Sequence, residues 1–460
     1  MALTNRSRDE GIPVATPSHW RLTSLRGLTL AVSAVILAGL SAPAQSQSTL
    51  SALPMGQSMS FGGASDPRTV QNTFQNPASL SASDRRGIWT GLGALGMGYE
   101  LGDVDDLEDR IDDVIDGLDE ENLTLARAEE LKEDIDEILV ELGRDGTIQI
   151  NAGLQPPLMP LGAGLPGIGG EFAIGFSGMG NIHASILDGP VEVQRVDDEF
   201  ELATTTSAYL KGGYGTTLSL GYSGTALFRD DGQLMLGARL NRYSMEMAKS
   251  VVALEDADDS DDLEDDLEDD FDENRNSDSA FGLDVGFLWD ARTYRVGGTL
   301  RNLNEPSLDY PEIGSDCASR SSTTAENNCL TAQTFADRID LGETHTMERQ
   351  LQLEGAVFTE NRNWSLSGSY DVNASRDLVG EEQQWATITG AFSGRGWWVP
   401  GVRLGYRSNQ AGSELDYITA GLTLFRVINI DAAVATDDVE YDGDEVPRAG
   451  MVSLSLELFY

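Results

Sequence analysis

The chain has 460 residues, 76 of them acidic and 31 basic, which gives a net charge of −45. A negative field of that size repels phosphate and excludes nucleic acid as a partner. It attracts divalent cations or basic surfaces, and it equally serves solubility in a salty environment. Zinc is disfavoured, because His19 lies in the predicted leader and the two cysteines are expected to form a disulfide, so the remaining His183 and His345 do not make a tetrahedral set.

The N-terminal 44 residues have the pattern of a secretory signal peptide. Arg21 and Arg26 precede an apolar stretch at 27–40, and Ala42-Pro43-Ala44 follows. That stretch is shorter than the ~20 residues needed to span a bilayer, so we predict cleavage after Ala44; a signal anchor is the alternative. No later segment is long and apolar, so a mature chain that enters a membrane must do so with strands.

Residues 45–86 show no strand alternation and are predicted to form an N-terminal plug. The segment contains the motif Asn76-Pro77-Ala78. Its apolar side chains are candidates for contact with a ligand in the lumen, or for the packing of the plug itself, since Met and Phe commonly fill gaps. These residues are Met55, Met59, Phe61 and Phe74.

A barrel is predicted to occupy residues 87–460, beginning with a strand at 88–99. A helical hairpin interrupts it at 103–143, where apolar residues recur at three- and four-residue intervals. Gly117 to Asn122 makes the turn, and Gly143 is expected as the C-terminal cap. The two helices either pack on each other or present a docking surface to a partner.

Segments of ~10 residues with alternating apolar and polar side chains follow, separated by Gly, Asn and Asp clusters, as in transmembrane barrels. The predicted fold is therefore an all-β, transmembrane antiparallel β-barrel of about 14 strands. The strands are expected at 147–154, 172–176, the 204–248 region, 280–289, 294–302, 350–358, 364–370, 385–392, 402–408, 417–425, 427–435 and 452–460.

Two long loops are expected in the second half of the chain. Residues 255–278 are dense in Asp and Glu, and we interpret them as a solvated, cation-attracting loop. A short helix carrying Leu263, Leu267 and Phe271 is the alternative. Residues 255–273 contain no glycine for a calcium-loop turn, so weak Ca²⁺ or Mg²⁺ binding is expected at most. No other cofactor is expected.

The second loop, at 304–345, contains Cys317 and Cys329. In an exported protein this spacing predicts a disulfide, which would stabilise the loop by about 3 kcal/mol in the chain-entropy model.

The final strand places Leu454, Leu456, Leu458 and Tyr460 on one face, and Ser453, Ser455 and Glu457 on the other. This alternation predicts lipid contact outside and a polar lumen inside, although an edge strand of a soluble protein has the same pattern. The strand resembles the C-terminal signal that bacterial barrels present to the barrel-assembly machinery.

No catalytic constellation is evident. An acyl-transfer site would need one of the two later histidines, His183 or His345, beside a nucleophile. The spacing places neither there, so we predict that the protein is not an enzyme.

The plug motif ahead of the first strand, the helical insertion after it and the C-terminal strand together resemble TraF-type barrels of conjugal transfer. In layout they also resemble FadL-type transporters. The resemblance implies a monomeric barrel in the outer membrane of a Gram-negative bacterium, and the FadL group implies passage of a small hydrophobic molecule. We therefore predict hydrophobic-ligand binding or transport, or a conjugation-related envelope role. The alternative is a surface adhesion barrel whose helical hairpin and acidic loop bind a partner or divalent cations.

Overall fold

A computed structural model describes residues 55–457, apart from 67–68, 71, 83–86, 119, 121–122, 165–168, 197–198, 258–259, 395 and 442. The predicted signal peptide lies outside the described residues, and so do Leu458 and Tyr460 of the final strand. The plug boundary at residue 86 also falls outside them and stays a prediction.

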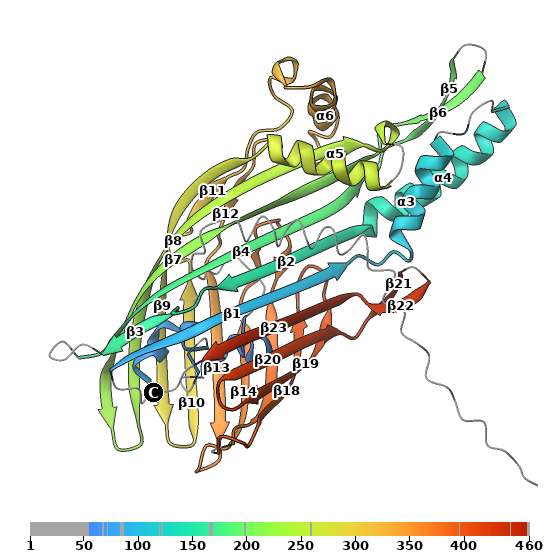
Figure 1. The fold of residues 1–460 in the computed structure, drawn as a ribbon. Helices are drawn as coiled ribbons and strands as arrows, with labels where there is room; N and C mark the ends of the chain where they lie inside the picture. Colours follow the sequence, from blue (N-terminus) through green and yellow to red (C-terminus); the bar gives the residue numbers. More distant parts are fainter. Residues whose placement is uncertain are drawn as a thin grey trace, which may run out of the picture.

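The chain folds into a closed antiparallel β-barrel (Figure 1). Because β2 and β3 both lie between β1 and β4, the 15 strands of the sheet occupy 14 positions around the barrel. The first and last strands close it through nine paired positions from Gly91 to Glu100. The predicted fold class and strand number are therefore confirmed.

The wall strands follow the predicted segments, with several running longer. Their bounds are β1 Ile88–Leu101, β2 Thr147–Gln155, β3 Leu161–Gly164, β4 Glu171–Leu187, β7 Ser207–Arg229, β8 Gly232–Ala253, β9 Asn276–Ala291, β10 Tyr294–Arg301, β13 Gln350–Phe358, β14 Trp364–Asp371, β17 Trp385–Phe392, β18 Gly401–Asn409, β19 Asp416–Leu424, β20 Ile428–Ala435 and β23 Ala449–Glu457.

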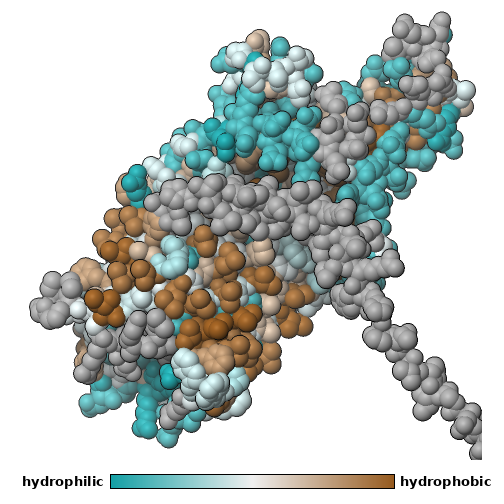
Figure 2. Space-filling model, in the orientation of Figure 1, coloured by the Kyte–Doolittle hydropathy of each residue, from teal (hydrophilic) through white to brown (hydrophobic). Residues whose placement is uncertain are grey.

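Burial alternates along the strands, as lipid-out and lumen-in packing requires. In β23, Ser453, Ser455 and Glu457 are buried, whereas Val452 and Leu454 are 52% and 46% exposed. Outward-facing apolar side chains of this kind form a hydrophobic band across the visible face of the barrel, with polar surface above and below it (Figure 2).

All long connections leave the barrel at one end, here called the loop end. They contain α3 (Leu107–Leu118) with α4 (Leu125–Asp145), the pair β5 (Val191–Val196) and β6 (Glu199–Thr204), α5 (Ser260–Glu273), β11 (Ser307–Asp309) with α6 (Thr323–Thr334) and β12 (Thr344–Thr346), β15 (Ser375–Arg376) with β16 (Glu382–Gln383), and β21 (Asp438–Tyr441) with β22 (Asp444–Pro447). Short turns such as 230–231 and 292–293 lie at the other end (Figure 1).

The helical hairpin forms as predicted, and its apolar stripe is covered within the molecule. Val114 and Ile115 of α3 pack with Ile135 of α4 in one buried cluster. The same cluster contains residues of β6, β8 and α5, so the hairpin packs on neighbouring loops as well as on itself. The expected cap at Gly143 is wrong. The helix continues to Asp145 and is capped by Gly146, whose N–H donates to Leu142 O.

The acidic segment is a helix, α5, so its interpretation as a solvated loop is wrong. Leu263 and Phe271 are buried, and Leu267 is partly buried against the hairpin cluster. Repulsion between like charges one turn apart costs ~0.2–0.5 kcal/mol per pair. Burial of one Leu or Phe contributes about 1.5–3 kcal/mol. Burial of the apolar stripe is therefore of the size needed to offset the summed repulsion.

The cysteine loop contains two short helices, η4 (Cys317–Ser319) and α6, which a disulfide between Cys317 and Cys329 joins. Ser322 caps α6 by accepting from Ala325 N at 3.0 Å. No helix in the described part of the chain is both long and apolar enough to cross a membrane.

Candidate functional site in the barrel lumen

The N-terminal segment lies inside the barrel, toward the short-turn end (Figure 1). It contains α2 (Ser58–Phe61) and two turns of 3-10 helix, η1 (Asn72–Phe74) and η2 (Pro77–Ala82). Helix α2 contacts β17, β18, β19 and β20, whereas η2 contacts β7, β8 and β9. The segment therefore crosses the lumen from one side of the wall to the other.

One buried carboxylate joins two parts of this segment to the wall. Glu354 on β13 accepts from Asn76 Nδ2 at 2.7 Å through one oxygen. Its other oxygen accepts from Ser65 N at 2.5 Å and Ser65 Oγ at 2.6 Å. Hydrogen bonds to a charged acceptor are stronger than neutral ones, so Glu354 is a principal anchor of the plug.

The closing strand also holds the plug. Glu457 Oε2 accepts from Val70 N at 2.9 Å, and Ser453 Oγ accepts from Gly56 N at 2.6 Å. The inward polar face predicted for β23 thus has a second role beside solvation of the lumen. It ties the last strand of the barrel to the plug segment.

The Asn76-Pro77-Ala78 motif has a local explanation. Asn76 Oδ1 accepts from Ala78 N at 2.9 Å and so caps η2, which begins with Pro77. The side chain of Ala78 is buried with Met235 and Leu288. Its carbonyl accepts from Ser223 Oγ at 2.8 Å. The motif therefore docks η2 on β7, β8 and β9.

Glycines in the wall make room for this contact. A Cβ atom on Gly237 would lie 2.4 Å from Pro77 C and O. One on Gly286 would lie 2.1 Å from Asn76 Oδ1, and one on Gly221 would lie 3.1 Å from Leu80. Glycine on three consecutive strands therefore lets the plug backbone approach the wall more closely than any side chain would allow.

The four apolar plug residues proposed as ligand contacts are all buried. Met59 packs with Leu415 and Tyr417, and Phe74 packs with Val70 and Trp89. Phe61 and Phe74 also lie about 6.0 Å from the guanidinium carbons of Arg403 and Arg239 respectively. In this structure these side chains form packing contacts between the plug and the wall. Packing of the plug is the alternative to ligand contact that was given above.

The wall is interrupted between the end of β2 and the start of β3, next to Phe74 and Met55 of the plug. Five residues, 156–160, separate β2 from β3, opposite only three residues of β1, 91–93. On the side facing β4, residues 175–177 have no ladder partner in β2 or β3. Phe74 lies behind Gly175, where a Cβ would be 2.9 Å from its Cε1, and Met55 lies behind Gly153 at the same distance. Apolar plug side chains therefore back the interruption.

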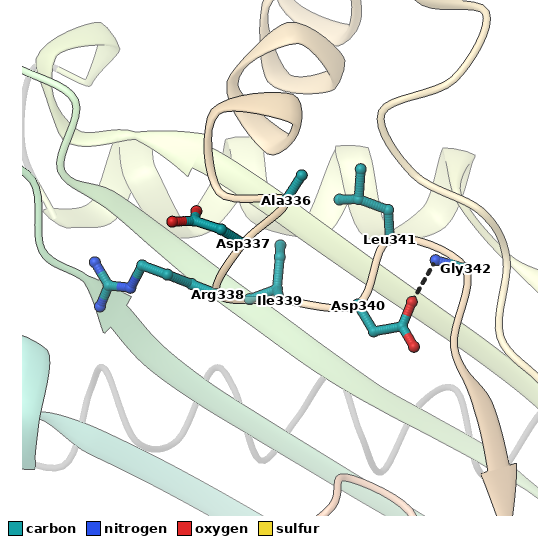
Figure 3. A pocket seen from close by; sticks show the side chains of 7 residues that line it. All are labelled: Ala336, Asp337, Arg338, Ile339, Asp340, Leu341 and Gly342. Carbon is teal, nitrogen blue, oxygen red and sulfur yellow. Dashed lines mark hydrogen bonds between the residues drawn. The ribbon is translucent and has the colours of Figure 1, made fainter.

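The two later histidines, His183 and His345, lie on β4 and β12. Over the described residues, no hydrogen bond joins His183 or His345 to a hydroxyl group, and no cluster of three His, Cys, Asp or Glu side chains could hold a metal. His345 lies on β12 in the cysteine loop, and burial lowers its pKa to about 4. An open pocket of about 490 Å³ is lined by residues 336–342 of the cysteine loop alone (Figure 3). None of the plug residues lines it.

Comparison with known proteins places the chain in a family. The model of the family described as "F plasmid transfer operon, TraF, protein" matches residues 73–371, more than half of the chain. This chain belongs to the TraF family. The match begins next to the Asn76 motif and includes the helical hairpin, α5 and the disulfide loop.

Several solved barrels are similar to this TraF-family chain at low identity. The toluene transporter TbuX of Ralstonia pickettii has a TM-score of 0.40 and 10% identity, covering 90% of this chain and 100% of its own. A FadL homologue of Pseudomonas aeruginosa has a TM-score of 0.37 and 12% identity, covering 90% and 98%. Comparison with curated proteins gives no match.

The wall residues that complete the site in this TraF-family barrel were not predicted. Glu354, Gly237 and Gly286 lie more than 150 residues from the plug motif. An inward-facing Glu in β13 is a signal of a lumen contact, but its partner could not be inferred without the register of the barrel.

Proposed function

We propose that the protein is a monomeric outer-membrane barrel that binds or passes a small hydrophobic molecule through the interrupted wall position between β1 and β4. The carrying observation is that residues 156–160 are hydrogen-bonded to Gly91 of β1 but have no ladder partner on β4, and that Phe74 and Met55 lie behind this part of the wall. Leu158 and Ile174 beside it are 62% and 43% exposed on the outer surface. An apolar molecule would therefore meet apolar side chains on both sides of the wall.

The proposed location in the outer membrane rests on the surface of the barrel and on the leader. The outer band is apolar, the lumen is polar, and the leader predicts export with cleavage after Ala44. Assembly by the barrel machinery through the final strand is part of the proposal. The loop end is assigned to the cell surface, because barrels of this kind keep long loops outside and short turns in the periplasm.

The test closes the interruption. Deletion of Pro157 and Leu158 leaves three residues opposite the three of β1, and it preserves the inward and outward alternation of β3. In cells making the protein, this variant should take up the apolar dye 1-N-phenylnaphthylamine more slowly than wild type. Pro157→Ala is the control, since it keeps all five residues and leaves the side chains of Leu158 and Ile174 in place.

Folding of both variants is checked by heat-modifiable migration on SDS gels. Unchanged dye uptake in a folded deletion variant would show that the interruption is not the route. Mass spectrometry of compounds that copurify from native membranes then identifies the natural ligand class. A purified barrel with an empty lumen would count against transport.

A second candidate is a docking role for the loop end, such as a conjugation-related contact or adhesion. One observation favours it: the α3–α4 hairpin projects as a supported unit (Figure 1). Arg110 of α3 pairs with Glu141 of α4 at 2.8 Å, and Tyr441 of the β21–β22 hairpin donates to Glu108 at 2.9 Å. Deletion of residues 104–142 should abolish partner binding and leave dye uptake intact if this role is correct.

A further inference from the structure

The lumen contains a buried cation that lacks the partner its neighbours have. Arg239, Arg295 and Arg403 each pair with a carboxylate, at 2.7 Å to Asp284, 3.0 Å to Asp290 and 2.9 Å to Asp431. Arg407, four residues beyond Arg403 on the same strand, is only 4% exposed. It forms no ion pair with any described carboxylate, and its Nε and Nη1 have no hydrogen-bond acceptor.

Two hydroxyl groups beside Arg407 are also without partners. Thr387 is paired with Arg407 across β17 and β18, and Thr419 lies on the adjacent strand β19, opposite Gly405. Their Oγ1 atoms are buried and make no hydrogen bond. The nearby Asp371 does not supply the missing charge by contact. Its oxygens accept from Gln352 Nε2 at 2.7 Å and Trp385 N at 3.1 Å.

Two aromatic rings lie near the guanidinium group of Arg407. The guanidinium carbon of Arg407 lies 3.6 Å from the ring centroid of Trp385, and that ring is 5.7 Å from Tyr417. An unpaired buried charge costs several kcal/mol, whereas a bound anion would offset much of that cost. One guanidinium and two neutral hydroxyls match a single negative charge, so a carboxylate fits better than a doubly charged phosphate.

We propose that Arg407, Thr387 and Thr419 bind the carboxylate of a small aromatic acid, whose ring lies near Trp385 and Tyr417. This inference rests on the proposed function, because it names the class of molecule that enters the lumen. Plug helix α2 covers the site. Met59 packs with Tyr417, and a Cβ on Gly62 would lie 2.5 Å from Thr387 Oγ1. The helix has four residues between Gly56 and Gly62, both at positive φ, so it can shift as the acid binds.

The experiment measures benzoate binding to the full-length protein in detergent by calorimetry, at low ionic strength where screening is weak. Wild type should bind benzoate. Arg407→Gln should weaken binding at least tenfold, and Arg407→Lys should restore part of it by returning the charge. Arg242→Gln, on the exposed outer face of β8, is the control and should bind as wild type does. Heat-modifiable migration confirms that each variant is folded.

Neutral benzyl alcohol separates this inference from the proposed function. Binding of benzyl alcohol that ignores Arg407, together with benzoate binding that Arg407→Gln does not change, would overturn the acid site and leave hydrophobic-ligand binding standing. Failure of wild type to bind benzoate would also overturn the site. Acetate binding as tight as benzoate binding would overturn the aromatic assignment.

Discussion

Gly237 illustrates how a single residue controls the docking of the plug. Its missing side chain leaves room for the backbone of Pro77, which cannot retreat as a flexible side chain would. Gly237→Ala should therefore lower the free energy of unfolding by about 1–3 kcal/mol through overpacking. Thermal unfolding in detergent measures this. Gly355→Ala is the matched control, because the nearest atom to its Cβ would be Arg295 O at 3.9 Å. Equal stability of the two variants would contradict the close approach.

Asp377 is a residue whose ionisation affects the loop between β14 and β17. Its Oδ1 accepts from the amides of Val379, Gly380 and Glu381, and its Oδ2 accepts from Gln149 at 2.8 Å and Asn181 at 2.9 Å. Burial raises its pKa from 3.8 to about 6. The ionised form is thus disfavoured in the folded loop. That cost is present above about pH 6 and disappears as the pH falls toward the unfolded value.

The loop should consequently gain stability between pH 7 and pH 5, relative to Asp377→Asn, which cannot titrate. Hydrogen-exchange protection of amides 379–381, corrected for the intrinsic rate, measures this difference. His345 acts with the opposite sign, because burial lowers its pKa to about 4 and its protonation on acidification costs stability. His345 is common to both proteins, so the comparison at each pH removes its effect. A difference that stays constant with pH would be evidence against the proposed titration.

At the scale of elements, we expect α5 to depend on its apolar stripe and not on cations. Leu263→Ala should lower the stability of the folded helix by about 2–5 kcal/mol, as for other buried Leu substitutions. Limited proteolysis of the detergent-solubilised protein should then cleave α5 faster than in wild type. Glu268→Ala, an exposed position on the same helix, should not change the rate. A chelator should leave cleavage unchanged, and faster cleavage with chelator would restore the cation-dependent interpretation.

The elements that were predicted correctly are those with a local signal. The alternation of β14 and β23 and the three-four spacing of the hairpin are each contained within one segment, so no tertiary information is needed. The prediction failed for α5, where the charge pattern was weighted above three apolar residues. Their burial depends on β8 and the hairpin, which the sequence does not place beside them. Arg407 was missed for the same reason, since an unpartnered charge is defined only by its neighbours.

At the scale of the whole molecule, the antiparallel alternation of the strands fixes which connections share an end. With 14 positions in the wall, the hairpin, α5 and the disulfide loop emerge together, as the predicted surface location requires. An epitope inserted after Glu312 in the disulfide loop should therefore bind antibody on intact cells. An epitope inserted between Asp230 and Asp231, in the turn joining β7 and β8, should bind antibody only after the outer membrane is permeabilised. The reverse result would invert the barrel and place the acidic helix in the periplasm, where a surface docking role is excluded.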